Sequence, residues 1–327
     1  MSDVLHPPLL QVRDLVVDLK VREGWVRALD GIGFSMQAGE VLGMVGESGA
    51  GKSLTGAAIM GQLEPPLKMT AGQVLLQGRR IDNLPRADMQ RVRGREIAAI
   101  FQDPLTSLNP LFTIGQQLIE TVQVLLRLDA RAARLRALEL LGEVGIPGAA
   151  QRLDSYPHQF SGGMRQRVAI ALALAGKPRL IVADEPTTAL DVSVQAQIIA
   201  LLKRLCRDHG TSVLLGTHDM GVIAEVADRV AVLYAGRLVE LAPVRAAIEQ
   251  PLHPYTTGLM RSIPVVGARA ERLVQLDGAM PRLGAIPAGC AFNPRCPHAF
   301  DRCMSEVPPA THVDNQLVNC WLHEHAR

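Results

Sequence analysis

The octapeptide GESGAGKS at residues 46–53 restricts the possible folds of this chain more than any other stretch. It lies between an apolar run at 40–45, which predicts a buried strand, and a segment at 53–62 whose small and apolar residues have helical spacing. In the pattern G-x-x-x-x-G-K-[ST], glycines let the backbone curl so that its N–H groups point at phosphate oxygens, and the following helix adds its positive N-terminal end. A glycine-rich turn without a nucleotide is the alternative. The flanking strand and helix favour a P-loop nucleotide site in an α/β fold.

Each residue of this loop has an expected part in holding a triphosphate. Lys52 reaches the β- and γ-phosphates, and Ser53 offers its hydroxyl to Mg²⁺. The residues expected to bind the nucleotide here are Gly46, Glu47, Ser48, Gly49, Ala50, Gly51, Lys52 and Ser53.

A pair of carboxylates ends a second apolar run. Asp184 and Glu185 follow LIVA at 180–183, which predicts two acidic side chains at the carboxyl edge of a strand, where ligands bind in open parallel sheets. Asp184 can hold the Mg²⁺ shell, and Glu185 can polarise an attacking water. An acidic turn that only closes the strand is the alternative interpretation.

A second helix start that favours anions is predicted at FSGGMRQR, residues 160–167. Ser161 stands at the cap position, Gly162 and Gly163 allow close approach, and the apolar segment 168–175 continues as a helix. Taken alone, these residues fit an ordinary capped helix equally well. The presence of a P-loop in the same chain makes the functional interpretation more specific.

Six short motifs occur in the order found in one protein family. They are the Walker A loop at 46–53, the Q-loop at Gln102, the signature loop at 161–164, the Walker B carboxylates at 184–185, the D-loop at 189–191 and the switch histidine, His218. With these motifs, nearly the whole chain resembles the ATP-binding subunit of an ABC transporter. The strings FQDPLTSLNP, YPHQFSGGMRQR, ADEPTTALDVSVQAQI, VLYAGRLVE and HPY (253–255) resemble most the dipeptide and oligopeptide importer ATPases, a group that also includes nickel importers.

The resemblance implies a role for each matching residue, with ATP and Mg²⁺ as ligands. The expected catalytic residues are Glu185, His218, Lys52 and Gln102. The expected Mg²⁺ ligands are Ser53, Gln102 and Asp184. The residues expected to complete the ATP site of a facing ATPase are Ser161, Gly162 and Gly163. Asp191 of the D-loop is also expected to bind nucleotide. Two ATP molecules are then sandwiched between two subunits, and their binding and hydrolysis close and open the pair.

Two positions depart from the common family pattern. The signature loop ends in Met164 where many ABC proteins have glutamine, and the peptide-importer group resembles this chain in having methionine there. The place where an aromatic residue usually stacks on adenine holds Leu19. Trp25 follows six residues later, and it either substitutes for that aromatic or packs as a core residue of a hairpin.

The order of the predicted elements gives a coarse domain plan. Alternating segments at 9–34 and 73–76 predict an antiparallel layer, and strand–helix alternation at 41–62 and 180–239 predicts a mostly parallel sheet. The helix-rich part at about 105–175, with helices at 114–126 and 130–142, is the expected contact to a membrane subunit. We therefore expect an α/β P-loop ABC ATPase core at 1–254 with an antiparallel β layer and an inserted helical subdomain, followed by a small cysteine-containing extension at 255–327.

Charge and hydropathy restrict the expected location of the protein and the partners that it can bind. The net charge of +2 argues against a polyanion-binding surface, and the Arg-rich piece at 131–136 fits the solvated face of a helix. No stretch approaches the ~18 uninterrupted apolar residues of a membrane span, and the start MSDVLHPPLL lacks a basic region followed by an apolar core. We expect a protein inside the cell, peripheral at the cytoplasmic face of the inner membrane, that binds no nucleic acid.

Four cysteines gather near the end of the chain, at Cys290, Cys296, Cys303 and Cys320. Clustered thiols in a reducing cytosol favour a metal over disulfides, and the spacing lacks the C-x2-C knuckle of a zinc ribbon. In the peptide-importer ATPases that this segment resembles, the site is associated with a four-iron four-sulfur cluster. We therefore expect such a cluster, with zinc or no metal as alternatives. Cys206, in an apolar helix, reads as an ordinary buried thiol.

The expected function is ATP hydrolysis that energises import of dipeptides or oligopeptides. The expected partners are two membrane-spanning permease subunits, an extracytoplasmic substrate-binding protein and a second ATPase, either a related chain or a copy of this one. An importer of nickel or another small solute is the alternative within the family. A soluble ABC ATPase acting on nucleic acid or ribosomes is the alternative from another class, but it commonly has two cassettes or long basic or coiled-coil insertions, which this chain lacks. The sequence does not identify the transported substrate.

Overall fold

The structure is a computed structural model. It describes residues 7–188, 190–262 and 276–324. The chain divides into two compact units: unit 1 comprises 1–37, 41–83 and 216–327, and unit 2 comprises 38–40 and 84–215. Both units carry part of the expected nucleotide machinery. The P-loop and His218 belong to unit 1, whereas Gln102, the signature loop and the paired carboxylates belong to unit 2.

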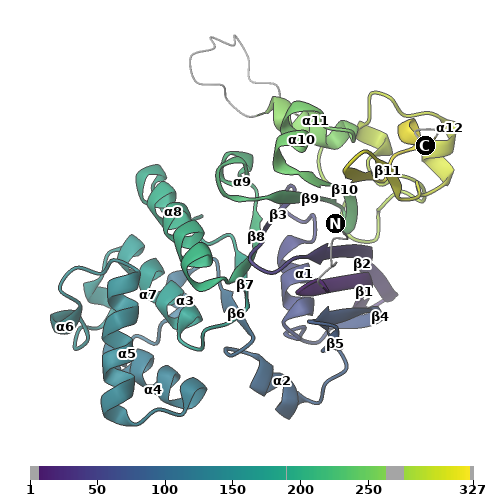
Figure 1. Ribbon diagram of the computed structural model, residues 1–327. Coiled ribbons are helices and arrows are strands. Elements are labelled where there is room, and N and C mark those ends of the chain that lie inside the picture. The colour runs from purple at the N-terminus through teal and green to yellow at the C-terminus, as the bar shows by residue number, and fades with distance from the viewer. Residues whose placement is uncertain (1–6, 189, 263–275, 325–327) are drawn as a thin grey trace, which may run out of the picture. The chain divides into compact units, whose positions relative to one another are not determined.

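An antiparallel sheet forms one layer of unit 1 (Figure 1). Its strands, in the order β2-β1-β4-β5, are Gly24–Met36, Leu10–Val21, Leu67–Leu76 and Arg79–Arg80. The two long strands, β1 and β2, are paired along their length and bury apolar side chains such as Leu15, Leu29 and Ile32. The antiparallel layer predicted from the alternating segments is confirmed.

A second sheet in unit 1 carries the P-loop. Its strands, in the order β11-β12-β10-β9-β3, are Thr311–Val313, Gln316–Val318, Arg237–Pro243, Arg229–Tyr234 and Val41–Val45. Strands β3 and β9 are parallel, and the other pairs are antiparallel. Every residue of β3 is buried, as is typical of parallel strands that are covered on both faces. The P-loop therefore leaves a rigid strand of the core.

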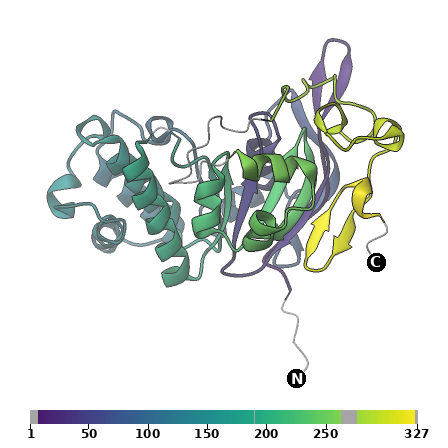
Figure 2. The same cartoon turned by 90° about the horizontal axis from the view of Figure 1, so that it is seen from above.

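Short helices complete unit 1. They are α1 (Lys52–Ile59), α9 (Met220–Val226), α10 (Val244–Glu249), α11 (Pro254–Arg261) and α12 (Asp301–Ser305), with 3-10 helices η2 (Asn293–Arg295) and η3 (Trp321–His323). Through β12, which pairs with β10, the C-terminal part of the chain joins the second sheet (Figure 2). The domain boundary near residue 254 stays a prediction.

Unit 2 combines three strands with a helix-rich segment. The strands, in the order β8-β7-β6, are Ser212–Thr217, Leu180–Asp184 and Ile97–Ile100, and β8 ends in unit 1. The helices are α2 (Arg86–Val92), α3 (Pro104–Ser107), α4 (Ile114–Leu126), α5 (Ala130–Glu143), α6 (Ala149–Arg152), α7 (Gly162–Leu174) and α8 (Val192–His209), with the 3-10 helix η1 (Pro157–Gln159). Helices α4 and α5 lie side by side and bury Leu118 and Leu140 (Figure 1). Both helices were expected from the sequence. The predicted range for α5 ended one residue before its observed end at Glu143.

Polar caps explain where several of these helices begin. Thr113 and Gln116 form a capping box at the start of α4, in which each side chain bonds the other residue's backbone N–H. Asp129 accepts a hydrogen bond from the Ala132 N–H at 2.8 Å and starts α5. Cys206 is buried in α8, as expected. Within the described part of the chain, no helix is both long enough and apolar enough to span a membrane.

Candidate nucleotide site

The P-loop is packed so closely that its first position accepts only glycine. A Cβ atom at Gly46 would lie 2.3 Å from the carbonyl oxygen of Leu233 in β9 and 2.7 Å from Ala50 Cβ. Gly46 also has a φ of 153°, which L side chains rarely adopt. The turn between β9 and β10 supports the loop from the same side, because the Gly236 N–H donates to Ala50 O at 2.9 Å. The backbone of the loop is therefore closely packed and already curled into a cradle. Its N–H groups can approach a phosphate without interference from a side chain at Gly46.

Lys52 is folded over this cradle. Its Nζ donates to Gly46 O at 2.8 Å and lies 3.3 Å from Glu47 O, and the side chain is buried. A buried ammonium held by loop carbonyls is a fixed positive charge at the start of helix α1. Ser53 follows it in the first turn of α1. The cradle, the cation and the hydroxyl together fit a phosphate group with its Mg²⁺ ion.

In unit 2, the paired carboxylates stand at the end of a strand, as the sequence predicts. Asp184 is the last residue of β7, and Glu185 follows it with a φ of 44°, an uncommon conformation for a residue other than glycine. The Glu185 carboxylate accepts a hydrogen bond from Thr188 Oγ1 at 2.8 Å. Backbone strain of this kind is concentrated at functional sites because surrounding contacts must hold it.

The Q-loop glutamine reaches the same carboxylate. Gln102 follows β6, which pairs in parallel with β7, so both side chains leave the same edge of neighbouring strands. The Gln102 Nε2 donor lies 3.5 Å from Glu185 Oε2, a long contact. Gln102 and Glu185, 83 residues apart in sequence, are therefore brought together as the motifs imply.

The signature loop and the D-loop begin two helices that pack on each other. Ser161 caps α7 by accepting a hydrogen bond from the Met164 N–H, and Asp191 caps α8 by accepting one from the Val194 N–H at 3.0 Å. A Cβ at Gly163 would lie 2.6 Å from Val194 Cγ1, so glycine allows this close approach. The hydrogen bond from Val194, together with one from Ser193, lowers the pKa of Asp191. Ala189, the first D-loop residue, lies outside the described residues.

The switch histidine, His218, and the candidate adenine-stacking residue, Trp25, are both exposed. His218 is exposed directly after β8 and before Asp219, which caps α9 with hydrogen bonds from two backbone N–H groups. Trp25 is 55% exposed near the tip of the β1–β2 hairpin, opposite Lys20. The interpretation of Trp25 as a hairpin core residue is therefore wrong, and its stacking on adenine stays a prediction.

The expected metal cluster in the C-terminal segment is wrong. Within residues 7–188, 190–262 and 276–324, no three His, Cys, Asp or Glu side chains are arranged to hold a metal ion. Burial raises the pKa of Cys290 and Cys296, and raises that of Cys320 to about 11. Neither the four-iron four-sulfur cluster nor zinc is supported among the described residues.

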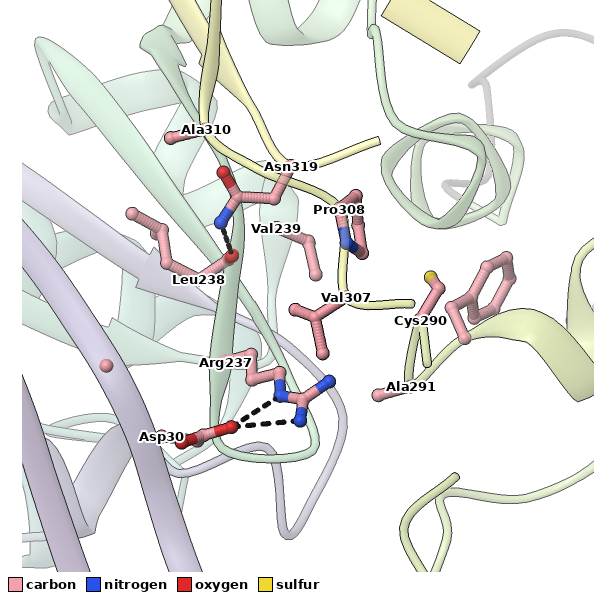
Figure 3. Close-up of a pocket in the computed structure, with 12 residues that line it drawn as sticks. Asp30, Arg237, Leu238, Val239, Cys290, Ala291, Val307, Pro308, Ala310 and Asn319 are labelled. Carbon is pink, nitrogen blue, oxygen red and sulfur yellow. Dashed lines mark hydrogen bonds and ion pairs between the residues drawn. The ribbon is translucent and has the colours of Figure 1, made fainter. Parts of the chain in front are cut away.

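Cys290 instead lies in the wall of a cavity between the C-terminal segment and the second sheet. The cavity, of about 270 Å³, is lined by Val239, Ala291 and Val307 among others (Figure 3). Beside it, Arg237 forms an ion pair with Asp30 at 2.9 Å and donates to Gly289 O at 2.8 Å. These contacts tie the C-terminal segment to β10 and β2.

The histidine of the HPY string is a buried cap. His253 Nδ1 accepts a hydrogen bond from the Tyr255 N–H at 3.0 Å and starts α11, and the His253 N–H donates to Glu240 Oε2 at 2.8 Å. Burial, with a smaller contribution from His323, lowers the pKa of His253 to about 3. His253 is therefore neutral in the folded protein.

We expect the folded protein to lose stability through His253 as the pH falls from 6.5 towards 5. In this window the unfolded chain takes up a proton on His253 and the folded chain does not, so stability falls by up to about 1.4 kcal/mol per pH unit. His253→Asn keeps a capping acceptor and removes the titrating ring. Urea unfolding at pH 6.5 and 5 should show a smaller loss for the variant, and equal losses in both proteins would contradict this account.

The P-loop follows a buried parallel strand, paired carboxylates end another strand, and a serine caps a helix that begins with two glycines. Together these features define a P-loop ATPase of the ABC class. The ABC transporter family matches residues 29–188, and the family described as "Oligopeptide/dipeptide transporter, C-terminal region" matches residues 239–303. The chain is therefore an ABC-type ATPase with that C-terminal region.

Two relatives match the chain over almost all of its length. It is 45% identical to the oligopeptide transport ATP-binding protein OppD of Haemophilus influenzae, over 96% of this chain and 97% of the relative. It is also 45% identical to the dipeptide transport ATP-binding protein DppD of Bacillus subtilis, over 97% of this chain and 95% of the relative. A dimeric post-hydrolysis structure of the ATP-binding cassette MJ0796 bound to ADP and Pi has a TM-score of 0.65 at 30% identity, covering 72% of this chain and 99% of the other. The chain belongs to the family of oligopeptide and dipeptide ABC transporter ATP-binding proteins.

Sequence reasoning missed three residues that hold the site. Tyr255 and Arg295 contact the P-loop residue Glu47 across 208 and 248 positions of the chain. Glu240, fully buried in β10, accepts hydrogen bonds from the Leu252 and His253 N–H groups. The only signal was the HPY string, which marked His253 and Tyr255 as characteristic of the subfamily but gave no partner for them.

Proposed function

We propose that this chain hydrolyses ATP to power import of dipeptides or oligopeptides by an ABC transporter. The observation that carries the proposal is the P-loop cradle, closed to any side chain at Gly46 and covered by the buried cation of Lys52. The names of the relatives support peptides as the transported class, because the similarity extends through the C-terminal region as well as the ATPase core.

Each residue of the site then has a part in phosphoryl transfer to water. Lys52 and the loop N–H groups hold the β- and γ-phosphates, and Ser53, Asp184 and Gln102 hold Mg²⁺, which offsets charge on the phosphates. Glu185 orients and polarises the attacking water. The hydrogen bond from Thr188 at 2.8 Å supports this role because it orients the Glu185 carboxylate, and Gln102 lies beside the same oxygen. His218 contacts the γ-phosphate.

The signature and D-loop residues serve a facing ATPase. Ser161, Gly162, Gly163 and Asp191 complete the nucleotide site of the other subunit, so that ATP stabilises the closed pair and hydrolysis releases it. The capped, tightly packed starts of α7 and α8 support this, since they present backbone N–H groups on a rigid base. The facing subunit is a related chain or a second copy of this one.

The proposed assembly places this subunit on the cytoplasmic face of the inner membrane. Two membrane-spanning permease subunits bind the helix-rich segment that contains α4 and α5, and an extracytoplasmic protein delivers the substrate. Residues 255–327 form an extension typical of the peptide importers. Trp25, exposed at its hairpin, is available to stack on adenine.

Uptake by cells that lack this chain tests the proposal. We expect such cells to lose uptake of labelled di- and tripeptides, to regain it with the natural chain, and to regain none with Glu185→Gln at equal abundance. Nickel uptake, measured in the same cells, is the control for the other importer class. Unchanged peptide uptake together with lost nickel uptake would replace peptides by nickel as the substrate.

A further inference from the structure

The P-loop contains a carboxylate in a place where negative charge is unfavourable. Glu47 is the second residue of the cradle, next to Gly46 and five residues before Lys52. A triphosphate carries several negative charges, and like charges in a partly buried site repel each other strongly. An unpaired Glu47 would therefore oppose the binding that the rest of the loop favours.

The structure pairs this carboxylate with an arginine from the C-terminal segment. Arg295 Nη1 donates to Glu47 Oε2 at 3.1 Å, and Nη2 lies 3.0 Å from Oε1 in an ion-pair contact. The Arg295 side chain is 6% exposed, against 30% for Glu47. An arginine buried to this extent beside one carboxylate neutralises it with little screening by solvent.

Other contacts hold the arginine in this position. Its Nε donates to Asp277 O at 2.7 Å, and its guanidinium lies over the rings of Tyr234 and Phe292, 5.8 and 5.9 Å from the centroids. Burial alone would lower the pKa of Arg295, but the hydrogen bonds to Glu47 and Tyr234 outweigh it and the pKa is raised. Arg295 is thus a fixed, charged partner rather than a mobile surface side chain.

A tyrosine holds the backbone of the same loop residue. The Glu47 N–H donates to Tyr255 Oη at 2.9 Å. Tyr255 is fully buried, and its ring packs against Tyr234 and Phe292 with centroids 4.7 and 5.4 Å away. Glu47 is therefore held at two points, the carboxylate by Arg295 and the amide by Tyr255, from one aromatic cluster.

We propose that Arg295 and Tyr255 are positioning residues of the ATP site: Arg295 neutralises Glu47, Tyr255 fixes its amide, and through them the C-terminal segment sets the affinity of the P-loop for phosphate. The inference rests on the proposed nucleotide site but not on what is transported. The inference gives the segment after residue 254 a role in nucleotide binding. Arg295 and Tyr255 lie outside all six motifs.

Opposite charge changes at the two ends of the ion pair test the inference. Dissociation constants for Mg-ATP, measured by calorimetry on the full chain, should rise about tenfold for Arg295→Met, equivalent to about 1.4 kcal/mol. Glu47→Gln keeps the backbone of the loop, removes the repulsive carboxylate and leaves the Arg295 cation beside the phosphates, so it should tighten binding. The double variant should return to within about threefold of the natural chain. Because the repulsion is screened by ions, the Arg295→Met defect should shrink as salt rises from 0.05 to about 0.5 M.

A purely structural role gives different results. If Arg295 only holds the fold, Glu47→Gln should weaken binding as well, and the double variant should be as weak as Arg295→Met; either result overturns the inference. If Arg295→Met does not fold, the Glu47→Gln variant is tested by itself. Weaker Mg-ATP binding by Glu47→Gln would still contradict the inference. Arg302→Met is the matched control, since Arg302 lies in the same segment but pairs with Glu306 at 2.8 Å and stacks on Trp321.

Tyr255→Phe tests the second contact without changing charge. Loss of the phenol oxygen should speed hydrogen exchange at the Glu47 amide at least about tenfold in the nucleotide-free protein, with the melting temperature measured alongside. Unchanged exchange at that amide would remove Tyr255 from the inference. A natural chain that binds no Mg-ATP at all would instead refute the nucleotide site itself, which keeps the two failures distinguishable.

Discussion

Glu185→Gln is expected to lower ATP turnover by at least about a hundredfold, because an amide cannot polarise the attacking water as a carboxylate does. Nucleotide affinity should stay within a few-fold of that of the natural chain, since Lys52 and the loop N–H groups remain. The measurement is steady-state phosphate release in the assembled transporter, with Mg-ATP binding determined on the same preparation.

The matched control for this change is Glu64→Gln, an exposed carboxylate outside every motif. Its turnover should equal that of the natural chain. A Glu185→Gln variant that kept more than about a tenth of normal turnover would refute the assignment, because it falls outside the range expected for loss of a general base.

Lys52→Ala is expected to fail at an earlier step. The change removes a buried cation that is held 2.8 Å from Gly46 O and that supplies charge-assisted hydrogen bonds to the phosphates. Such bonds to charged groups contribute about 1.5–3 kcal/mol, so the dissociation constant of Mg-ATP should rise roughly ten- to a hundredfold. Direct binding measurements show this without any need for turnover.

An exposed lysine provides the comparison. Lys68→Ala, on β4, removes the same charge from the chain and should leave the affinity unchanged. Equal affinity for Mg-ATP in Lys52→Ala and Lys68→Ala would refute the role of Lys52 at the phosphates.

The positions relative to strands and helices that the sequence predicted well are those encoded by short, contiguous strings. Glycines at 46 and 51, the acidic pair at 184–185 and the serine at 161 occupy fixed places next to a strand end or a helix start, and local geometry decides these. The meeting of Gln102 with Glu185 also follows from local rules, because each residue follows one of two strands that pair in parallel. The parallel pairing itself was expected from the alternation of strands and helices.

Contacts across the chain were beyond the reach of the same reasoning. Nothing in the spacing of residues indicates that the Tyr255 hydroxyl meets the Glu47 amide, because any buried tyrosine needs a polar partner and many are available. Trp25 shows a related limit, since alternation in a hairpin gives two faces but not which one is covered. The C-terminal cysteines show the opposite error, in which a cluster in sequence was taken for a cluster of ligands.

The hairpin of β11 and β12 has a consequence for the integrity of the whole protein in solution. By pairing with β10, it converts what would be an open sheet edge into an interior strand, and it ends the sheet with a strand only three residues long. Short edge strands offer little template for pairing with another molecule, whereas a longer apolar edge such as β10 invites aggregation. A chain shortened after residue 303 would keep every catalytic motif but would expose the edge of β10. We expect such a chain to aggregate although its catalytic residues are present.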